Sequence, residues 1–285
     1  MGPLVTRAVD VHVHLLSEDM IRESDKLRAR DPYFDLLCTN PKNAFATAEQ
    51  ALSTMDDSGV ELSVIFSFAF ADIGACREGN DYIIHTLRQY PGRFIGFCCV
   101  PPRDPGALKE VVRCREAGLS GVGELFPDGQ RFDITDEREI GALVGQVQEC
   151  SMYLMVHCNE MVGHSYPGKG GTGPEQAYRL AVNHPGVPMI FPHWGGGLVF
   201  YETMPEVRRD LQHVRYDTAA DPFLYTTSAY MAAAAAGLTD KIVFGSDYPL
   251  LPPARYFQRL EHSGLGQEDI ARITSGNARE FLKLQ

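Results

Sequence analysis

The sequence predicts an α/β protein of the TIM-barrel class, a (β/α)8 barrel, and three observations support that fold class. Eight short apolar runs lie near residues 9, 63, 95, 121, 154, 188, 214 and 242, and intervals of helix length separate them. Continuous apolar runs are typical of parallel strands buried on both faces, and repeated strand and helix units are typical of a barrel of about 250 residues. No linker rich in Pro, Gly or Ser divides the 285-residue chain. We therefore expect a single domain over residues 1–285, with a long insertion after the first strand and a C-terminal helix.

The first strand covers residues 9–14, and the interval that follows it is long. Residues 15–45 are polar, carry mixed charges and contain Pro32 and Pro41. An interval of this length exceeds an ordinary connection between elements, so we expect it to form a lid or an oligomer contact. The apolar residues of 47–58 then have helical spacing, and Gly59 is a usual helix terminator.

The rest of the chain alternates between strand and helix patterns. We expect strands at 62–66, 94–100, 121–125, 153–157, 187–193, 214–217 and 241–247, and helices at 80–90, 105–117, 136–150, 174–183, 206–211, 224–236, 253–262 and 267–282. The main alternative, an open doubly wound sheet, usually carries a Gly-rich phosphate-binding turn after its first strand. His14, Leu15 and Leu16 occupy that place, which favours the barrel.

Composition and charge argue against several classes of protein. The formal net charge is -11, whereas a general nucleic-acid binder normally carries a basic patch. The seven cysteines form no C-x-x-C pair and are odd in number, so we expect reduced thiols and a cytoplasmic protein. Residues 1–7 lack the apolar core of a signal peptide, and no run approaches the roughly 18 apolar residues of a membrane span. We expect no nucleic-acid or membrane partner.

Metal-ligating residue types close several of the expected strands. In a TIM barrel the active site lies at the carboxyl ends of the strands, and residues two apart on a strand point the same way. His12 and His14 can therefore bind one ion together. The candidates at strand ends are His12, His14, Glu124, His157, His193 and Asp247. A structural zinc site normally has four ligands and no surplus, so six candidates favour a metal site in an enzyme.

The order of these motifs resembles that of the amidohydrolase superfamily. The chain has His-x-His in its first strand, histidines after the fifth and sixth strands, and Asp after the eighth. Residues 9–14, Pro192-His-Trp-Gly-Gly196, Gly245-Ser-Asp-Tyr-Pro249 and Gly276-Asn-Ala-Arg279 are similar to the amidohydrolase-related branch, which includes aminocarboxymuconate-semialdehyde decarboxylase-like enzymes. The resemblance implies a divalent cation, Zn²⁺ being our expectation, held by His12, His14, His157 and Asp247.

The resemblance also implies catalytic roles for Asp247 and His193. A zinc ion lowers the pKa of its bound water, and Asp247 would take a proton from that water and later return one. His193 would orient the water or stabilise negative charge on a substrate oxygen. Glu124 leaves two alternatives open. It is either a bridge between two ions, as in TatD-type deoxyribonucleases, with His157 and His193 on the second ion, or a structural or substrate-orienting carboxylate beside one ion.

The loop at residues 158–174 contains five glycines and is placed to cover the metal. We expect this loop to set specificity, with Lys169 meeting a substrate carboxylate and Trp194 and Tyr248 as further substrate contacts. Residues 163–170 nearly match a phosphate-binding loop, but Gly170 replaces the hydroxyl residue that would hold magnesium. The near match therefore does not favour a nucleotide function.

Two reactions on a small-molecule substrate fit these observations. Our main expectation is a metal-dependent hydrolase that directs a metal-activated water at an amide, lactone or ester-like bond. The alternative is a mononuclear-metal non-oxidative decarboxylase of a small unsaturated or aromatic acid. Fold and ligand set do not separate the two reactions. The family resemblance also makes a homodimer an expectation.

Overall fold

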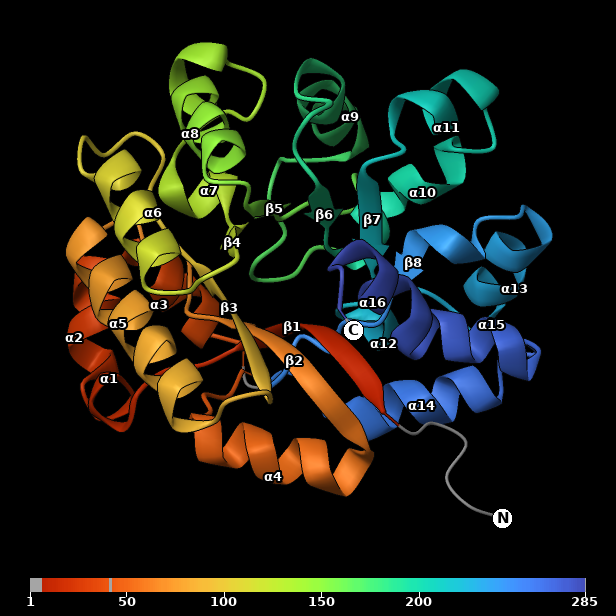
Figure 1. The fold of residues 1–285 in the computed structure, drawn as a ribbon, viewed down its shortest axis with the longest axis horizontal. Coiled ribbons are helices and arrows are strands. Elements are labelled where there is room, and N and C mark those ends of the chain that lie inside the picture. Colours follow the sequence, from red (N-terminus) through yellow and green to blue (C-terminus); the bar gives the residue numbers. More distant parts are fainter. Residues whose placement is uncertain (1–6, 41–42, 285) are drawn as a thin grey trace.

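The computed structural model describes residues 7–40 and 43–284, and in this part of the chain eight strands form one sheet in the order β1 to β8 (Figure 1). The strands are β1 (Ala8–His14), β2 (Val60–Phe66), β3 (Phe94–Cys98), β4 (Gly121–Leu125), β5 (Tyr153–Val156), β6 (Met189–Phe191), β7 (Val214–Asp217) and β8 (Ile242–Val243). Each neighbouring pair from β1 to β8 is parallel. The predicted TIM-barrel class is confirmed, and each expected strand is present.

Backbone hydrogen bonds between the first strand and the residues after the last one close the barrel. The N–H of Val11 donates to the carbonyl of Phe244 at 2.9 Å, and the N–H of His14 donates to the carbonyl of Tyr248 at 2.8 Å. Closure brings the residues after β8 beside the end of β1. Polar side chains from the two ends of the sequence can therefore share one site.

Buried apolar side chains form two groups on the two faces of the sheet. Leu154 and Val156 of β5 belong to one group, whereas Met155 between them belongs to the other, together with Ile190 of β6. Successive strand residues point to opposite faces, so the first group packs beneath the helices and the second fills the barrel interior. His157 lies two residues after Met155 and continues the inward face toward the site.

An outer ring of helices surrounds the strands (Figure 1). Its members are α4 (Ala48–Ser58), α5 (Ile73–Gln89), α6 (Ala107–Glu116), α8 (Glu137–Glu149), α9 (Pro174–Asn183), α11 (Pro205–Asp210), α13 (Ser228–Ala235) and α14 (Pro253–Glu261). The short helices α7 (Pro127–Gln130), α10 (Leu198–Tyr201) and α12 (Asp221–Leu224) follow β4, β6 and β7 in the sequence. Local sequence explains the boundaries of α4. The side chains of Thr47 and Gln50 cap each other's backbone N–H groups, and Gly59 ends the helix with φ of 76°.

The long insertion after β1 folds into three short helices, α1 (Glu18–Arg22), α2 (Ser24–Arg30) and α3 (Pro32–Cys38). Asp31 caps α3 by accepting the backbone N–H groups of Tyr33 and Phe34. Its second oxygen accepts the N–H of Ala71 at 2.7 Å. One buried carboxylate therefore fixes α3 against the segment that follows β2, at the mouth of the barrel.

Three helices differ from the expectation by more than two residues, and one of them, α13, begins at Ser228 rather than near residue 224. Helix α5 begins at Ile73 rather than near residue 80, because the side chain of Asp72 caps it by accepting the N–H of Ala75. Its first turns also place Gly79 tightly against Ser67, where a Cβ would lie 2.4 Å from the Ser67 hydroxyl oxygen. The close packing removes the apolar spacing that marks a helix in sequence. The expected C-terminal helix at 267–282 is α15 (Gln267–Ala271) and α16 (Asn277–Phe281), joined by a wider helical turn over Arg272–Gly276.

Residues 1–6, where we expected no signal segment, lie outside the described residues. Across 7–40 and 43–284, every helix is too short or too polar to span a bilayer.

Candidate metal centre and substrate cavity

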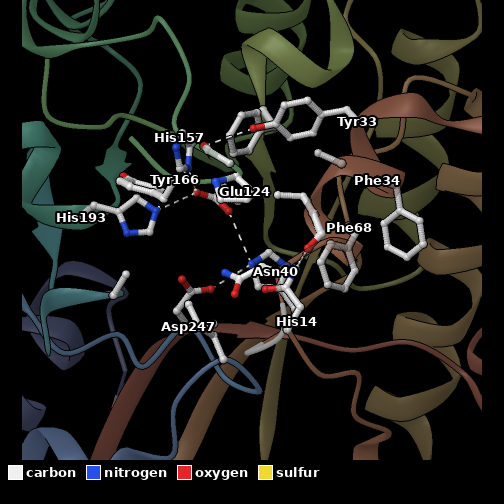
Figure 2. Close-up of a pocket in the computed structure, with 18 of the residues that line it drawn as sticks. His14, Tyr33, Phe34, Asn40, Phe68, Glu124, His157, Tyr166, His193 and Asp247 are labelled. Carbon is white, nitrogen blue, oxygen red and sulfur yellow. Dashed lines mark hydrogen bonds and ion pairs between the residues drawn. The ribbon is translucent and has the colours of Figure 1, made fainter. Parts of the chain in front are cut away.

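The carboxyl ends of five strands bring the six predicted metal ligands into two adjacent groups. The first group is His12, His14 and Asp247, and the second is Glu124, His157 and His193. No more than 15 % of any of these six side chains is exposed. Figure 2 shows His14 and Asp247 on one side of a cavity, with Glu124, His157 and His193 facing them. Residues separated by up to 235 positions in the sequence therefore meet at one mouth of the barrel.

In the first group, the donor atoms converge on one point. The Nε2 atoms of His12 and His14 lie 3.1 Å apart, and Oδ1 of Asp247 lies 3.5 Å and 3.4 Å from them. Oε2 of Glu124 lies 3.5 Å from each of the same two nitrogens. Glu124 therefore supplies a fourth donor to this group.

The other oxygen of Glu124 faces the second group. Oε1 lies 2.9 Å from Nδ1 of His157 and 3.7 Å from Nε2 of His193, and these two nitrogens are 3.2 Å apart. The structure thus groups His157 with Glu124 and His193, whereas the sequence resemblance implied His157 beside His12, His14 and Asp247. Glu124 has the position of a bridge, one of the two alternatives left open by the sequence.

Three of the histidines are held by the ring nitrogen that points away from the centre. Nδ1 of His12 lies 2.9 Å from Oδ2 of Asp217, and Nδ1 of His193 lies 2.9 Å from the carbonyl of Ala219. Nε2 of His157 lies 2.7 Å from the side-chain oxygen of Asn159. Because these partners accept hydrogen bonds, each can hold a proton on the outer ring nitrogen, which leaves the other ring nitrogen available to a cation at the centre. Such outer partners commonly orient histidines that bind a metal.

Charges within the site keep its two acidic donors ionised. Burial alone would raise the pKa of Glu124, but the charges of His12 and His157 outweigh burial and hold that pKa well below its usual range. Burial acts on Asp247 in the same direction, and the charge of His12 with the hydrogen bond from His14 lowers the pKa of Asp247 to about 2. Both carboxylates are negatively charged at neutral pH.

The donor set fits a divalent cation. Ligands about 2.1 Å from one ion in a tetrahedral arrangement lie about 3.4 Å from each other, close to the separations in the first group. Two carboxylates balance a doubly positive ion, and imidazole and carboxylate donors accept several divalent metals. His12, His14, Asp247 and Glu124 are the residues whose spacing best matches one ion.

A cavity of about 340 Å³ opens onto these donors. His14, Glu124, His157, His193 and Asp247 line its floor, and aromatic side chains form much of its wall: Tyr33, Phe34, Phe68, Phe70, Phe126, Tyr166 and Phe223. The ring of Phe68 stacks on His14 with a centroid distance of 4.8 Å, and Phe126 stacks on His157 at 3.9 Å. Flat apolar surfaces therefore lie directly beside the donors, as Figure 2 shows for Phe68.

Two segments roof the cavity. Helix α3 supplies Tyr33 and Phe34, and the loop at 158–174 supplies Tyr166 and Gly168. The hydroxyl of Tyr33 donates to the carbonyl of Gly168 at 3.1 Å and joins the two segments. The expected lid role of the insertion and the expected specificity role of the loop stay predictions, but both segments border the cavity.

The three residues expected to contact substrate do not line this cavity. Trp194 is fully buried and stacks on Phe200 with a centroid distance of 5.9 Å. Tyr248 contacts Thr54, since their hydroxyl oxygens lie 3.3 Å apart. Lys169 donates to the carbonyls of Val162 and His164 and lies 3.2 Å from Glu160, so it braces the loop that carries it.

Sequence reasoning missed two residues that orient the donors. Asp217 is the last residue of β7 and contacts His12 directly. Its place at the end of a strand is the same signal that identified the six candidates. Asn159 follows His157 by two residues and holds its outer nitrogen. In neither case did the residue type alone distinguish a supporting role.

One curated relative and two solved structures that are similar to this chain are decarboxylases. Gamma-resorcylate decarboxylase of Polaromonas sp. strain JS666 is 24% identical over 290 residues, covering 83% of this chain and 87% of that protein. The crystal structure of 5-carboxyvanillate decarboxylase from Sphingomonas paucimobilis matches with a TM-score of 0.78 at 15% identity, over 99% of this chain and 100% of that chain. Dihydroxybenzoic acid decarboxylase from Polaromonas sp. JS666, with bound manganese and the inhibitor 2-nitroresorcinol, matches with a TM-score of 0.68 at 19% identity, over 98% of both chains.

These relatives correct the main functional expectation. Hydrolysis of an amide, lactone or ester-like bond was wrong as the leading reaction, because the named relatives catalyse decarboxylation. The error has a physical origin. The same donors can activate a water or hold a carboxylate, so the donors alone do not name the bond that breaks.

A match to a known protein family extends over the whole barrel. The family model described as amidohydrolase matches residues 9–284, from β1 to beyond α16. Because the match covers nearly the entire chain, the protein belongs to the amidohydrolase family.

Proposed function

We propose that this protein is a metal-dependent non-oxidative decarboxylase of a small aromatic or unsaturated carboxylic acid. One observation carries the proposal: two groups of histidine and carboxylate donors open directly onto a cavity whose wall is largely aromatic. Aromatic walls favour a flat ring, and the donors face the end of the cavity where its carboxylate would lie. The decarboxylase relatives named above support the same reaction.

The residues present fit a divalent metal, zinc or manganese, held by His12, His14, Asp247 and Glu124. When bound, such a cation supplies the positive charge that binds the substrate carboxylate and stabilises negative charge as it develops. The other work falls to the chain itself. Phe68 and Phe126 orient the ring and exclude water from the reacting carbon, and stacking against His14 and His157 holds these walls in place.

Decarboxylation requires one proton at the carbon that loses carbon dioxide. The bond between that carbon and the carboxylate breaks, its electron pair stays on the carbon, and a new C–H bond forms. We propose that Asp247, which is ionised in the free site, takes up a proton from solvent water and delivers it to that carbon, and that His193 stabilises the negative charge of the substrate, since both side chains line the cavity. Lys169, Trp194 and Tyr248 have no part in this scheme because they do not line the cavity.

The proposal is tested by incubating the full chain with Mn²⁺ or Zn²⁺ and a panel of aromatic acids. The panel contains 2,6-dihydroxybenzoate, 5-carboxyvanillate and their mono-hydroxylated analogues, and the readout is carbon dioxide release together with the decarboxylated product. We expect release from at least one acid, and Asp247→Asn lowers the rate by about 10³-fold or more.

Asp81→Asn serves as the matched control, because Asp81 is an exposed carboxylate on the outer helix α5 that pairs with Arg113. This variant should keep the wild-type rate. Absence of carbon dioxide release from the whole panel by metal-loaded protein contradicts the proposed reaction. Full activity in Asp247→Asn contradicts the role given to Asp247.

A further inference from the structure

Asp217, the last residue of β7, contacts both donor groups without belonging to either. Its side chain is fully buried. Oδ2 lies 2.9 Å from Nδ1 of His12, in the first group. Oδ1 accepts the backbone N–H of His193, in the second group, at 3.0 Å, and the N–H of Ala219 at 2.9 Å. One carboxylate therefore supports a donor residue on each side of the centre.

The residues around Asp217 favour its contacts with His12 and His193. Gly245 lies against the pair, and a Cβ there would be 2.9 Å from Cβ of His12 and 3.0 Å from Cγ of Asp217. His193 has a left-handed backbone with φ of 58°, and its N–H points at Asp217. The Ala219 carbonyl in turn accepts from Nδ1 of His193. The residues after β7 thus hold His193 by its backbone and by its ring.

A buried carboxylate is costly unless an opposite charge compensates it. In the described part of the chain, Asp217 forms no ion pair with a Lys or Arg side chain, and its Oδ2 faces the ring of His12 instead. A cation bound through the far nitrogen of His12 would supply the missing positive charge. The position of Asp217 is therefore better explained by a cation bound at the centre than by support of the fold alone.

We propose that Asp217 is a positioning residue of the metal centre. It fixes the His12 proton on Nδ1, which leaves Nε2 free to bind the cation, and it sets the position of His193 at the same time. This inference rests on the proposed metal centre. It assigns to Asp217 no contact with substrate or with the reacting atoms.

The Asp217→Asn variant separates this role from simple filling of space. The amide oxygen keeps accepting the backbone N–H groups of His193 and Ala219, which turns the amide NH₂ toward Nδ1 of His12. Two N–H donors cannot face each other, so His12 must move its proton to Nε2 or rotate away. Either change removes a lone pair from the first group, and we expect Mn²⁺ affinity to fall by about 10- to 100-fold.

Asp10→Asn is the matched control on strand β1, two residues before His12. Asp10 is also buried, and its Oδ1 accepts the backbone N–H groups of His12 at 3.1 Å and Ser246 at 2.9 Å. An amide oxygen accepts these N–H groups equally well, so Asp10→Asn should stay within about threefold of wild-type Mn²⁺ affinity. Titration of metal-free full-length protein with Mn²⁺, followed by electron paramagnetic resonance, measures all three affinities.

A spectroscopic measurement gives a second readout that does not depend on activity. In wild-type protein labelled with ¹⁵N-histidine and loaded with Zn²⁺, which is diamagnetic, His12 should carry its proton on Nδ1. A His12→Gln variant assigns the signal. Should Asp217→Asn fail to fold, this wild-type measurement still decides, because His12 without a proton on Nδ1 overturns the proposal.

The possible failures are distinguishable. Wild-type protein that binds neither Mn²⁺ nor Zn²⁺ overturns the proposed metal centre, and the role of Asp217 falls with it. Wild-type protein that binds Mn²⁺, alongside an Asp217→Asn variant of equal affinity, overturns only the role of Asp217. An equal loss in Asp10→Asn also counts against it, since the effect then belongs to buried acids in general.

Discussion

Glu124 places one carboxylate oxygen in each donor group, and this shared position is the residue-level feature that defines the centre. Oε2 lies 3.5 Å from Nε2 of both His12 and His14, and Oε1 lies 2.9 Å from Nδ1 of His157. A carboxamide has the same shape but offers a lone pair on only one side. Replacing this single side chain therefore affects one group while leaving the other in place.

Glu124→Gln should lower Mn²⁺ affinity by at least about tenfold, because one group then faces an NH₂ group in place of a carboxylate oxygen. Equilibrium dialysis against buffered Mn²⁺ followed by elemental analysis measures the affinity. The same experiment counts the ions per wild-type chain. Two ions falling to one in the variant would support a bridge.

Glu110→Gln is the control for this experiment. Glu110 is similarly buried but lies in α6, where it pairs with Arg113 and Asn80. It should keep wild-type Mn²⁺ binding. An unchanged Mn²⁺ content and affinity in Glu124→Gln would show that Glu124 is not a ligand.

Among the helices, a buried acid joins three elements on the β7 and β8 side of the barrel. Asp221 begins α12, accepts the hydroxyl of Tyr230 in α13 at 3.1 Å, and pairs with Arg259 of α14 at 3.0 Å. Burial raises the pKa of Asp221 to about 6, against an ordinary value of 3.8, and Arg259 offsets this only in part. The junction therefore responds to pH.

The direction in which stability changes with pH follows from proton binding by Asp221. The folded protein holds the Asp221 proton more tightly than the unfolded chain, so this contribution to stability is complete below about pH 4 and is lost as pH rises through about 6. Each pKa unit corresponds to about 1.4 kcal/mol, which makes the loss at most about 3 kcal/mol.

Urea unfolding of wild type and Asp221→Asn between pH 4 and pH 8 isolates this contribution. The free energy of unfolding of wild type relative to the variant should fall across that interval and level off above pH 7. A difference that stays constant with pH would contradict the raised pKa.

Across the whole molecule, the four proposed ligands come from the ends of β1, β4 and β8, so a bound cation would link segments that are far apart in the chain. The unfolded chain cannot hold these groups together, and binding to the folded state alone adds stability. At a free Mn²⁺ concentration of 100 times its Kd the gain is about 2.7 kcal/mol. The midpoint of thermal unfolding should then rise by about 5 °C.

Differential scanning calorimetry of metal-free protein, with and without Mn²⁺, measures that shift. The Asp247→Asn variant provides the comparison, and its shift should be clearly smaller. A wild-type midpoint that does not change with Mn²⁺ would contradict cation binding at the strand ends.

The barrel and its donors could be predicted because each leaves a local mark in the sequence. Eight apolar runs show where strands lie, and a polar residue that closes a run lies at the carboxyl end of the barrel. Glu124 and Asp247 were found in this way. Their division into two groups could not be, because it depends on the relative positions of side chains from different strands.

The substrate contacts could not be predicted for a different reason. Trp194 and Tyr248 each follow a candidate metal ligand directly in the sequence. At both positions the strand has already ended, so side chains no longer alternate between the two faces of the sheet. His193, Trp194 and Asp247 all have positive φ, between 58° and 61°, which redirects the chain after each strand. The cavity wall comes instead from residues such as Tyr33 and Phe68, whose aromatic character is equally common in protein cores.

On the proposed function, the two segments joined by the hydrogen bond between Tyr33 and Gly168 would select the substrate, whereas the residues below them would perform the chemistry. The chemical groups sit on strand ends braced by backbone contacts, whereas the ceiling above them belongs to an insertion and a glycine-rich loop. On that function, substitutions in the ceiling would change which acid is admitted while the proposed metal ligands stay the same. Close relatives that differ in α3 and in residues 158–174 would then catalyse the same reaction on different substrates.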